Sequence, residues 1–227
     1  MPVELVVPGP ARVLVVAPHM DDEVIPCGGT AILNADAGGT VGVVFVSDSG
    51  GGGDGQARER RVANRREEAR RVAESLGFEI VASLGFRDTK LPLYEGDIAA
   101  GLTEIIASFS PERVFCPFPS DAHADHQATA LATAAACKAA APRSEVWAYE
   151  LWTPIWPNKV VDIGSAVARK EKAIGLYASQ MADRDYAAAI LGLNRYRGMP
   201  FRLDYAETFY ACGVDEFSSL SRKLHLL

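Results

Sequence analysis

The stretch that decides the fold is residues 12–23, RVLVVAPHMDDE, in which an apolar run leads directly into a histidine and three acidic side chains. An unbroken run of small and branched apolar residues predicts a strand that is covered on both faces, as in a parallel α/β sheet. In open sheets of this kind, the loops at the carboxyl ends of the strands line the ligand crevice. We therefore expect residues 18–23 to lie at a functional site.

The same succession of strand and helix continues along the chain on the C-terminal side of this stretch. Further apolar runs predict strands at residues 41–47, 79–84, 113–118 and 145–151. Helical patterns separate these runs, at residues 23–35, 57–76, 98–109 and 125–141. The alternation predicts a Rossmann-like α/β fold: a doubly wound, mostly parallel sheet with helices on both faces.

The pattern weakens after residue 151. We expect only a short strand at 160–163, a helix at 167–177 and a late strand at 208–212. Gly77 stands where it can end the long helix at 57–76 in a left-handed conformation. Because the chain has neither an internal repeat nor a recognisable linker, we expect residues 1–227 to form a single domain.

Composition excludes several classes of protein. The 227 residues carry a net charge of −6, whereas nucleic-acid-binding proteins need a basic face. No apolar run approaches the roughly 20 residues of a membrane span, and the N-terminus does not resemble a signal peptide. The four cysteines have no CxxC spacing and predict free thiols in a reducing compartment. We expect a cytoplasmic protein with a small-molecule partner, able to form a homo-oligomer.

The histidines are few and concentrated. Three of the four lie in two short acidic motifs, PHMDDE at residues 18–23 and DAHADH at residues 121–126. Each motif follows a predicted strand and opens a predicted helix. Because carboxyl ends of parallel strands share one edge of a sheet, the two motifs, about 100 residues apart, can meet in space. Isolated histidines could simply cap helices or fill a core, but two such clusters favour a common site.

Imidazole and carboxylate groups are ligands that zinc prefers, and a catalytic zinc site keeps one position open for water. His19 and Asp22 are three residues apart, so they share one face of a first helical turn. His126 can complete a set of two histidines and one aspartate. Asp21 then points to a different side, where its carboxylate can take a proton from water.

The remaining histidine of the second motif is a candidate for contact with the substrate. His123 could polarise a substrate carbonyl or protonate a leaving nitrogen. Asp125 is placed to hold that imidazole in one orientation, as carboxylates often do for functional histidines.

At these motifs the sequence resembles the PIG-L/LmbE-type zinc N-deacetylases, whose hallmarks are His-Pro-Asp-Asp-Glu near the N-terminus and His-Pro-Asp-His farther on. Three more stretches are similar to the family's pattern, and they follow in the same order: RREEA at 65–69, YASQ at 177–180 and YAETF at 205–209. Met20 and Ala124 stand where the family has proline, so the backbone of both turns is less restricted by its residue types.

The resemblance implies a Rossmann-like α/β fold, one Zn²⁺ per chain and substrates that carry N-acetylglucosamine. Iron(II) or another divalent ion could occupy the same ligands. It implies these roles: His19, Asp22 and His126 as metal ligands, Asp21 as general base, His123 as acid or oxyanion-stabilising group with Asp125 behind it, and Arg65 as a residue that reaches the substrate or steadies the site.

Three further residues are weaker candidates for contact with a sugar. Asp48 follows a predicted strand, and Tyr94 lies in another loop; both could bind hydroxyl groups, although loop aspartates often bond their own backbone. Trp156 lies with Trp152 in a proline-rich segment, where an aromatic face could form the rim of a pocket or an interface. We select Trp156 as the rim candidate.

The glycine-rich loop leaves a second interpretation open. Gly50, Gly52 and Gly55 satisfy GxGxxG between a strand and a helix, which is typical of dinucleotide binding. A nucleotide- or sugar-binding module with a non-catalytic metal site is therefore an alternative, as is hydrolysis of another bond at the same site. Because the loop follows the second strand and not the first, we favour a flexible loop on the substrate side.

Overall fold

The computed structural model describes residues 3–182 and 184–225. Within these ranges one eight-stranded sheet has the order β1-β7-β8-β6-β5-β2-β3-β4. Its strands are β1 (Glu4–Val6), β2 (Arg12–Ala17), β3 (Thr40–Ser47), β4 (Glu79–Phe86), β5 (Arg113–Pro117), β6 (Glu145–Tyr149), β7 (Lys159–Asp162) and β8 (Ala206–Gly213). Only β8 runs antiparallel to its neighbours, β6 and β7. The predicted mostly parallel α/β sheet is confirmed.

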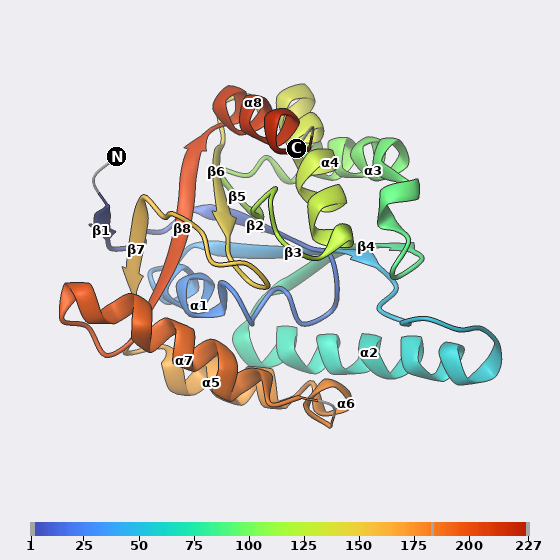
Figure 1. Ribbon diagram of the computed structural model, residues 1–227, viewed down its shortest axis with the longest axis horizontal. Helices are drawn as coiled ribbons and strands as arrows, with labels where there is room; N and C mark the ends of the chain where they lie inside the picture. Colours follow the sequence, from blue (N-terminus) through green and yellow to red (C-terminus); the bar gives the residue numbers. More distant parts are fainter. Residues whose placement is uncertain (1–2, 183, 226–227) are drawn as a thin grey trace.

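Helices cover both faces of the sheet (Figure 1). On one face lie α1 (Gly28–Asp36), α2 (Gly55–Leu76), α5 (Val167–Gly175), α6 (Ala178–Met181) and α7 (Tyr186–Gly198). On the other lie α3 (Glu95–Phe109), α4 (Ala124–Ala140) and α8 (Val214–His225). Short 3-10 turns span Leu91–Leu93 and Met199–Phe201. The described residues include no helix with both the length and the apolar character needed to cross a membrane.

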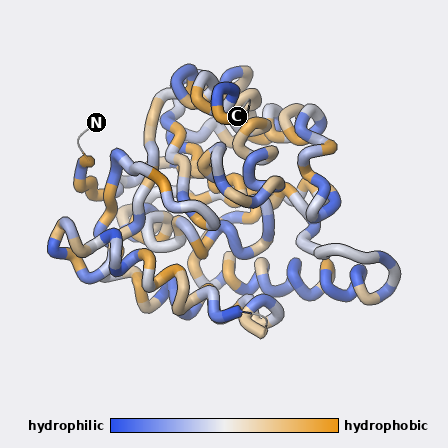
Figure 2. The backbone as a smooth tube through the Cα atoms, viewed as in Figure 1, coloured by the Kyte–Doolittle hydropathy of each residue, from blue (hydrophilic) through white to orange (hydrophobic). Residues whose placement is uncertain are grey.

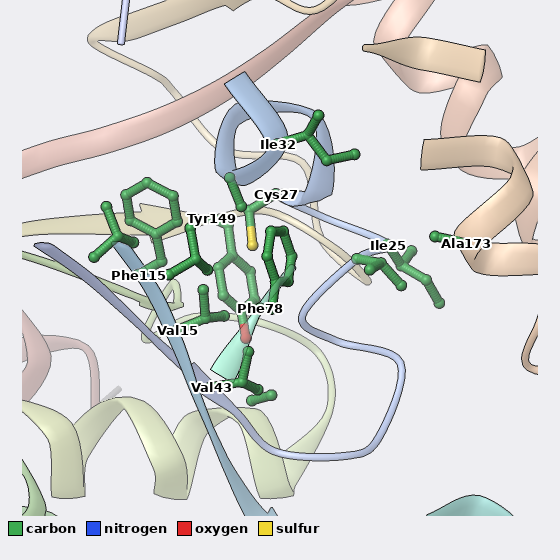
Figure 3. Packing of buried hydrophobic residues seen from close by; sticks show 14 of the residues in the cluster. Val15, Ile25, Cys27, Ile32, Val43, Phe78, Phe115, Tyr149 and Ala173 are labelled. Carbon is green, nitrogen blue, oxygen red and sulfur yellow. The ribbon is translucent and has the colours of Figure 1, made fainter. Parts of the chain in front are cut away.

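The central position of β2 explains its continuous apolar sequence. Val13 and Val15 belong to the hydrophobic cluster under α1 and α2, while Leu14 and Val16 belong to the cluster under α3 and α4. Figure 3 shows part of the first cluster, where side chains from neighbouring strands pack around Cys27. All four cysteines are buried and free, as the sequence predicted.

Helix α2 lies along the outside of the molecule, and Figure 2 shows that most of its length is hydrophilic. Only five of its 22 residues are buried, and two of these, Arg65 and Glu68, are charged. The helix ends where predicted, because Gly77 adopts a left-handed conformation with φ 70°. Burial of Arg65 and Glu68 brings this otherwise solvated helix against the edge of the functional site.

Two expectations about local structure were wrong or incomplete. The helix expected from residue 23 begins at Gly28, and residues 20–27 form turns. Asp21 has φ 142°, which a right-handed helix does not permit, so the acidic motif lies in a turn and not in a helix. The C-terminal region also contains α6, α7 and α8, and β1 forms the edge of the sheet beside β7; none of these elements was expected.

Candidate metal centre and active site

A cavity of about 650 Å³ opens at the carboxyl ends of the strands, a size typical of small-molecule sites. The loops after β2, β3 and β5 meet there with α2 and with the segment after β6. Its lining includes these polar or aromatic side chains: His19, Asp21, Asp22, Arg60, Arg61, Asn64, Arg65, Asp88, His123, His126, Trp152, Ser179 and Tyr186. The expectation that both histidine motifs reach one site is confirmed.

Three of these side chains form a compact group, which we call the metal cluster: His19, Asp22 and His126. Oδ2 of Asp22 lies 3.2 Å from Nδ1 of His19 and 3.3 Å from Nε2 of His126. One ligand atom from each residue can be chosen so that all lie within 4.8 Å of one another. Two imidazoles and one carboxylate at this separation match the donor set of catalytic zinc sites.

The chemistry of His126 provides a test of whether a cation fits. Its side chain is fully buried, yet neither ring nitrogen makes a hydrogen bond with any described residue. Nδ1 comes only within 3.5 Å of Asp121 Oδ1. Buried polar atoms without a partner are costly, and a metal ion would satisfy the nitrogen that faces Asp22. The donor set of the metal cluster therefore fits a divalent ion.

The electrostatics of the metal cluster also favour positive charge. Burial acts to lower the pKa of His126, but the charge of Asp22 and contacts with Asp121 and Asp22 outweigh it and raise that pKa to about 9. The pKa of His19 is likewise raised against the effect of burial, by Asp125, Asp22 and Asp88. Asp22 has a lowered pKa, because the two histidines overcome the effect of its burial. The carboxylates thus hold a cationic charge at this point.

Two carboxylates hold the far side of the His19 ring. Nε2 of His19 lies 3.1 Å from Asp125 Oδ2 and 3.2 Å from Asp88 Oδ1. The Asp125 carboxylate is itself fixed, since it accepts hydrogen bonds from the backbone N–H groups of Thr89 (2.8 Å) and Leu91 (3.0 Å). Such carboxylates orient a ligating imidazole and make it more basic.

His123 is held differently from what the sequence suggested. The Asp125 carboxylate was expected to orient its ring, but that carboxylate is engaged by His19 and the loop before α3. Instead, the backbone N–H of Asp125 donates to Nδ1 of His123 (3.2 Å). Because Nδ1 accepts, the hydrogen-bond pattern assigns the proton of the neutral ring to Nε2. Burial and the charges of His19 and His126 lower the pKa of His123, which favours this neutral form.

Asp21 lies in a strained turn beside the metal cluster. Its positive φ of 142° is unusual for a residue other than glycine and costs roughly 1–3 kcal/mol. The conformation is held by its backbone N–H, which donates to Glu23 Oε2 (3.0 Å), and by an ion pair of its carboxylate with Arg65 Nη2 (2.9 Å). Burial raises the pKa of Asp21 to about 7, and Arg65 opposes that rise. The turn fixes a carboxylate at the cavity wall.

Arg65 steadies this arrangement from α2. It is only 3% exposed, and its guanidinium lies over the ring of Tyr177, 4.9 Å from the centroid. One turn along the helix, Glu68 accepts hydrogen bonds from the backbone N–H (2.8 Å) and hydroxyl (2.6 Å) of Ser179. The RREEA and YASQ stretches are therefore in direct contact. Arg65 lies closer to the carboxylate of Asp21 (2.9 Å) than to that of Glu68 (3.8 Å).

Met20 replaces the proline of the related motif with a hydrogen bond. Its backbone N–H, which a proline would lack, donates to Ser49 Oγ at 2.8 Å. Met20 is buried in the core and does not line the cavity. The hydrogen bond to the loop after β3 thus restrains the turn, whereas in the family's motif proline does so.

Three weaker candidates do not line this cavity. Asp48 accepts hydrogen bonds from Arg58 of α2 (2.5 Å) and from the Gly50 N–H of its own loop, so both of its carboxylate oxygens are occupied. Tyr94 packs against Phe86 with ring centroids 5.4 Å apart. Trp156 is 94% exposed and borders a second cavity beside β7 and β8. The structure therefore does not place these three residues in the lining of the first cavity, where contact with a sugar was expected.

Three other residues lie at the cavity or support its lining: Trp152, Asp121 and Asp88. Trp152 lines the cavity, and its backbone N–H donates to Asp121 Oδ2 (3.0 Å). Asp121 also accepts from the His123 N–H (2.9 Å), so one buried carboxylate positions both residues. Asp88 contacts His19 and, through Oδ2, accepts from the Gly51 N–H (2.8 Å). Their place after strands β4, β5 and β6 was the available signal in the sequence.

The glycine-rich loop is tied down by side chains. The N–H groups of Gly50 and Gly51 donate to Asp48 and Asp88, and Arg61 donates to the carbonyl groups of Gly50 and Gly52. A phosphate-binding loop needs free N–H groups that point at the anion. Two of these are already used by carboxylates, which argues against the dinucleotide-binding interpretation.

A parallel α/β sheet with imidazoles and carboxylates gathered at its strand ends defines the class: a metal-dependent hydrolase. Comparison with known proteins makes the assignment specific. The PIG-L family model, described as GlcNAc-PI de-N-acetylase, matches residues 14–137. Diacetylchitobiose deacetylase of Thermococcus kodakarensis is 32% identical over 190 residues, which cover 76% of this chain and 71% of that protein. The chain belongs to the PIG-L family and is a deacetylase, an enzyme that hydrolyses an amide bond.

Two further comparisons show the range of similar proteins. The structure of N,N'-diacetylchitobiose deacetylase from Pyrococcus horikoshii, in complex with an inhibitor, has a TM-score of 0.81 and 26% identity; the match covers 91% of this chain and 86% of that one. A probable N-acetyl-α-D-glucosaminyl L-malate deacetylase of Bacillus cereus is 33% identical over 126 residues, or 52% of this chain and 56% of that protein.

Proposed function

We propose that this protein removes the acetyl group from an N-acetylglucosamine unit, either as a free sugar or as part of a conjugate, with Zn²⁺ held by His19, Asp22 and His126. The similar proteins are described as acting on diacetylchitobiose and on an N-acetylglucosaminyl malate, and both molecules contain this unit. The observation that carries the proposal is the largely buried metal cluster beside Asp21, at the wall of a cavity of suitable size.

The reaction needs a Lewis acid, a base and a donor for the developing oxyanion. Zinc bound at the metal cluster would lower the pKa of a water molecule and polarise the acetamide carbonyl. Asp21 can accept the proton of the attacking water at its carboxylate, since Arg65 opposes the effect of burial and favours the ionised form. The same proton can then pass to the amine nitrogen as the C–N bond breaks, which leaves acetate and a free amine.

His123 supplies the third requirement. With Nδ1 accepting from the Asp125 backbone, Nε2 carries the proton and is the donor. A neutral donor aimed at an oxyanion contributes typically roughly 10²–10³ in rate. Oxyanion stabilisation is therefore the role that we assign to His123, in preference to protonation of the leaving nitrogen.

Trp152 is our candidate for contact with the sugar ring. It lines the cavity, its ring centroid is 6.3 Å from that of His123, and it is 42% exposed. A pyranose ring has an apolar face of C–H groups and a polar edge of hydroxyl groups, and an aromatic side chain at a partly wet surface can stack on that apolar face. We assign to Trp152 the stacking role that the sequence suggested for Trp156.

The test is acetate release from a panel of N-acetylglucosamine glycosides by the zinc-loaded protein, with Asp21→Asn alongside. Loss of a general base typically costs roughly 10²–10⁴ in rate, so Asp21→Asn should keep its zinc and lose most of the activity. The metal content of both proteins is measured in the same samples. Full activity of Asp21→Asn would refute the mechanism.

The panel also separates the alternatives. Absence of release by a protein that demonstrably holds zinc would contradict the proposed substrate class and favour another acyl group or bond. Tight binding of a nucleotide or sugar without hydrolysis would support the binding-module alternative.

A further inference from the structure

The wall of the cavity changes charge from its buried part to its exposed part. The buried part contains the carboxylates Asp21, Asp22 and Asp88 around the metal cluster. On α2, Arg60, Arg61 and Asn64 are exposed and line the same cavity; we call these three residues the rim. A basic rim is unexpected in a chain with a net charge of −6. Its arginines therefore need an explanation of their own.

The arginines farther along α2 are explained by the helix itself. Arg70 forms ion pairs with Glu67 (2.8 Å) and with Glu74, and Arg71 pairs with Glu67 (2.9 Å). Pairs three and four residues apart stabilise a helix and keep its outer face soluble. These side chains are neutralised within the molecule.

Neither rim arginine forms an ion pair within the part of the chain that the structure describes. Arg61 donates to two carbonyl oxygens, those of Gly50 (2.9 Å) and Gly52 (2.7 Å), and so shapes the loop at the mouth of the cavity. Arg60 has neither an ion pair nor a hydrogen bond with any residue that the structure describes. Both keep a full positive charge at the entrance. The rim thus presents unneutralised charge toward the space where a ligand must enter.

We propose that the substrate carries a carboxylate or phosphate group on the part remote from its acetamide, and that Arg60 binds this group. The inference rests on the proposed function, which places the acetamide at the metal cluster and directs the rest of the molecule toward the rim. A guanidinium presents its donors in a planar fork that matches carboxylate and phosphate oxygens. Because Arg60 pairs with none of the residues that the structure describes, it can bind an anion without first breaking an ion pair to them.

The rim also explains why a neutral substrate is the poorer fit. A chain of neutral sugars offers hydroxyl groups, which Asn64 and the face of Trp152 can bind without any charge. Arg60 and Arg61 both line the cavity, and an anionic group bound there would gain an attraction between opposite charges that a hydroxyl group lacks. The two substrates named for similar proteins differ in this respect, since diacetylchitobiose is neutral and a malate conjugate is anionic.

The experiment compares substrates that differ only in charge. The carboxymethyl glycoside of N-acetylglucosamine and its carboxamide have nearly the same size, and a phosphonomethyl glycoside distinguishes phosphate-like from carboxylate recognition. We expect kcat/KM of the zinc-loaded wild type to be about tenfold higher for one or both anions than for the carboxamide, as for charge-assisted hydrogen bonds. In Arg60→Gln this ratio should fall toward one, and Arg60→Lys should keep part of it.

Arg66 provides the matched control, because it is exposed on the same helix and does not line the cavity. Arg66→Gln removes the same charge and should keep the wild-type ratio. Arg61 is unsuitable, since its replacement would release the glycine loop. The inference would be overturned by a ratio of anionic to carboxamide kcat/KM near one in the wild type, or by an equal fall of this ratio in Arg60→Gln and Arg66→Gln. In either case, acetate release from all three glycosides would still support the proposed function. Failure of every glycoside would instead refute the proposed function.

Discussion

The metal cluster and the rim line the same cavity, but they are built in opposite ways. The metal cluster is largely buried, comes from the turn after β2 and the first turn of α4, and is surrounded by carboxylates that fix each ring. The rim is exposed, comes from one helix, and leaves Arg60 without a partner among the described residues. From this difference we infer that the buried part of the cavity performs the chemistry and that the exposed part selects the substrate.

The physical basis of this division is screening. Charges in a buried, low-dielectric site interact strongly, and their geometry must be held by neighbouring groups. Charges at a wet rim interact weakly, are screened by salt, and can change with little effect on the fold. Substitutions in the metal cluster should therefore lower acetate release from every substrate. Substitutions at the rim should instead change the preference for anionic over neutral substrates.

The largest effect is expected from Asp22→Ala, which removes the carboxylate that lies between the two imidazoles. Zinc content should fall from about one per chain to a small fraction, because a catalytic site with three protein ligands loses one of them. Acetate release should become undetectable for neutral and anionic substrates alike. Asp36→Ala is the control, since Asp36 is exposed and bound to Arg169 on the outside of α1. Normal zinc content in Asp22→Ala would remove the metal cluster from the proposal.

The next effect concerns His123. His123→Ala should lower kcat by roughly 10²–10³ and leave zinc content and KM nearly unchanged, because the donor acts on the oxyanion that forms during the reaction. His123→Gln keeps an N–H donor and should recover part of the rate. Measurement of kcat and KM separately decides the role. A change confined to KM would show that His123 only contacts the substrate.

A smaller effect distinguishes the two tryptophans of the segment after β6. Trp152→Ala should raise KM about tenfold and change kcat little, because an aromatic face that covers a sugar contributes to binding and not to chemistry. Trp156→Ala should leave both constants at their wild-type values, since Trp156 borders the other cavity. Reversed results would restore Trp156 as the sugar contact.

The smallest effect is expected at the rim from salt. Raising the salt concentration from 0.1 to 1 M shortens the Debye length from about 10 to 3 Å, which screens exposed charges. The preference for the carboxylate over the carboxamide should therefore fall roughly two- to fivefold, while kcat for the carboxamide stays nearly constant. A preference that resists salt would place the anion-binding group in the buried part of the cavity.

The sequence predicted best those elements whose position in the fold requires a recognisable local pattern. The strands β2 to β6 were predicted because burial on both faces requires continuous apolar runs, and the ends differ by at most two residues. The direction of β8 could not be predicted, since a strand's own residues do not specify whether it pairs parallel or antiparallel. The edge strand β1 was missed because it has only three residues and is largely exposed.

The candidate site shows the same limit at the level of single side chains. The sequence indicated which residues meet, because imidazoles and carboxylates stand directly after strands that share one edge. It did not indicate that the Asp125 carboxylate turns toward His19 while its backbone holds His123. That choice depends on the loop before α3, whose N–H groups of Thr89 and Leu91 fix the carboxylate.

The sequence by itself determined the fold class, the family and the residue types of the metal cluster, because periodicity, burial and ligand chemistry are properties of short segments. Only the tertiary structure decided that Trp152 and not Trp156 lines the cavity, and that Asp21 lies in a strained turn paired with Arg65. It also decided that Arg60 lacks a partner among residues 3–182 and 184–225. These facts depend on backbone conformation and on contacts between segments far apart in the chain, which the residues of one short segment do not specify.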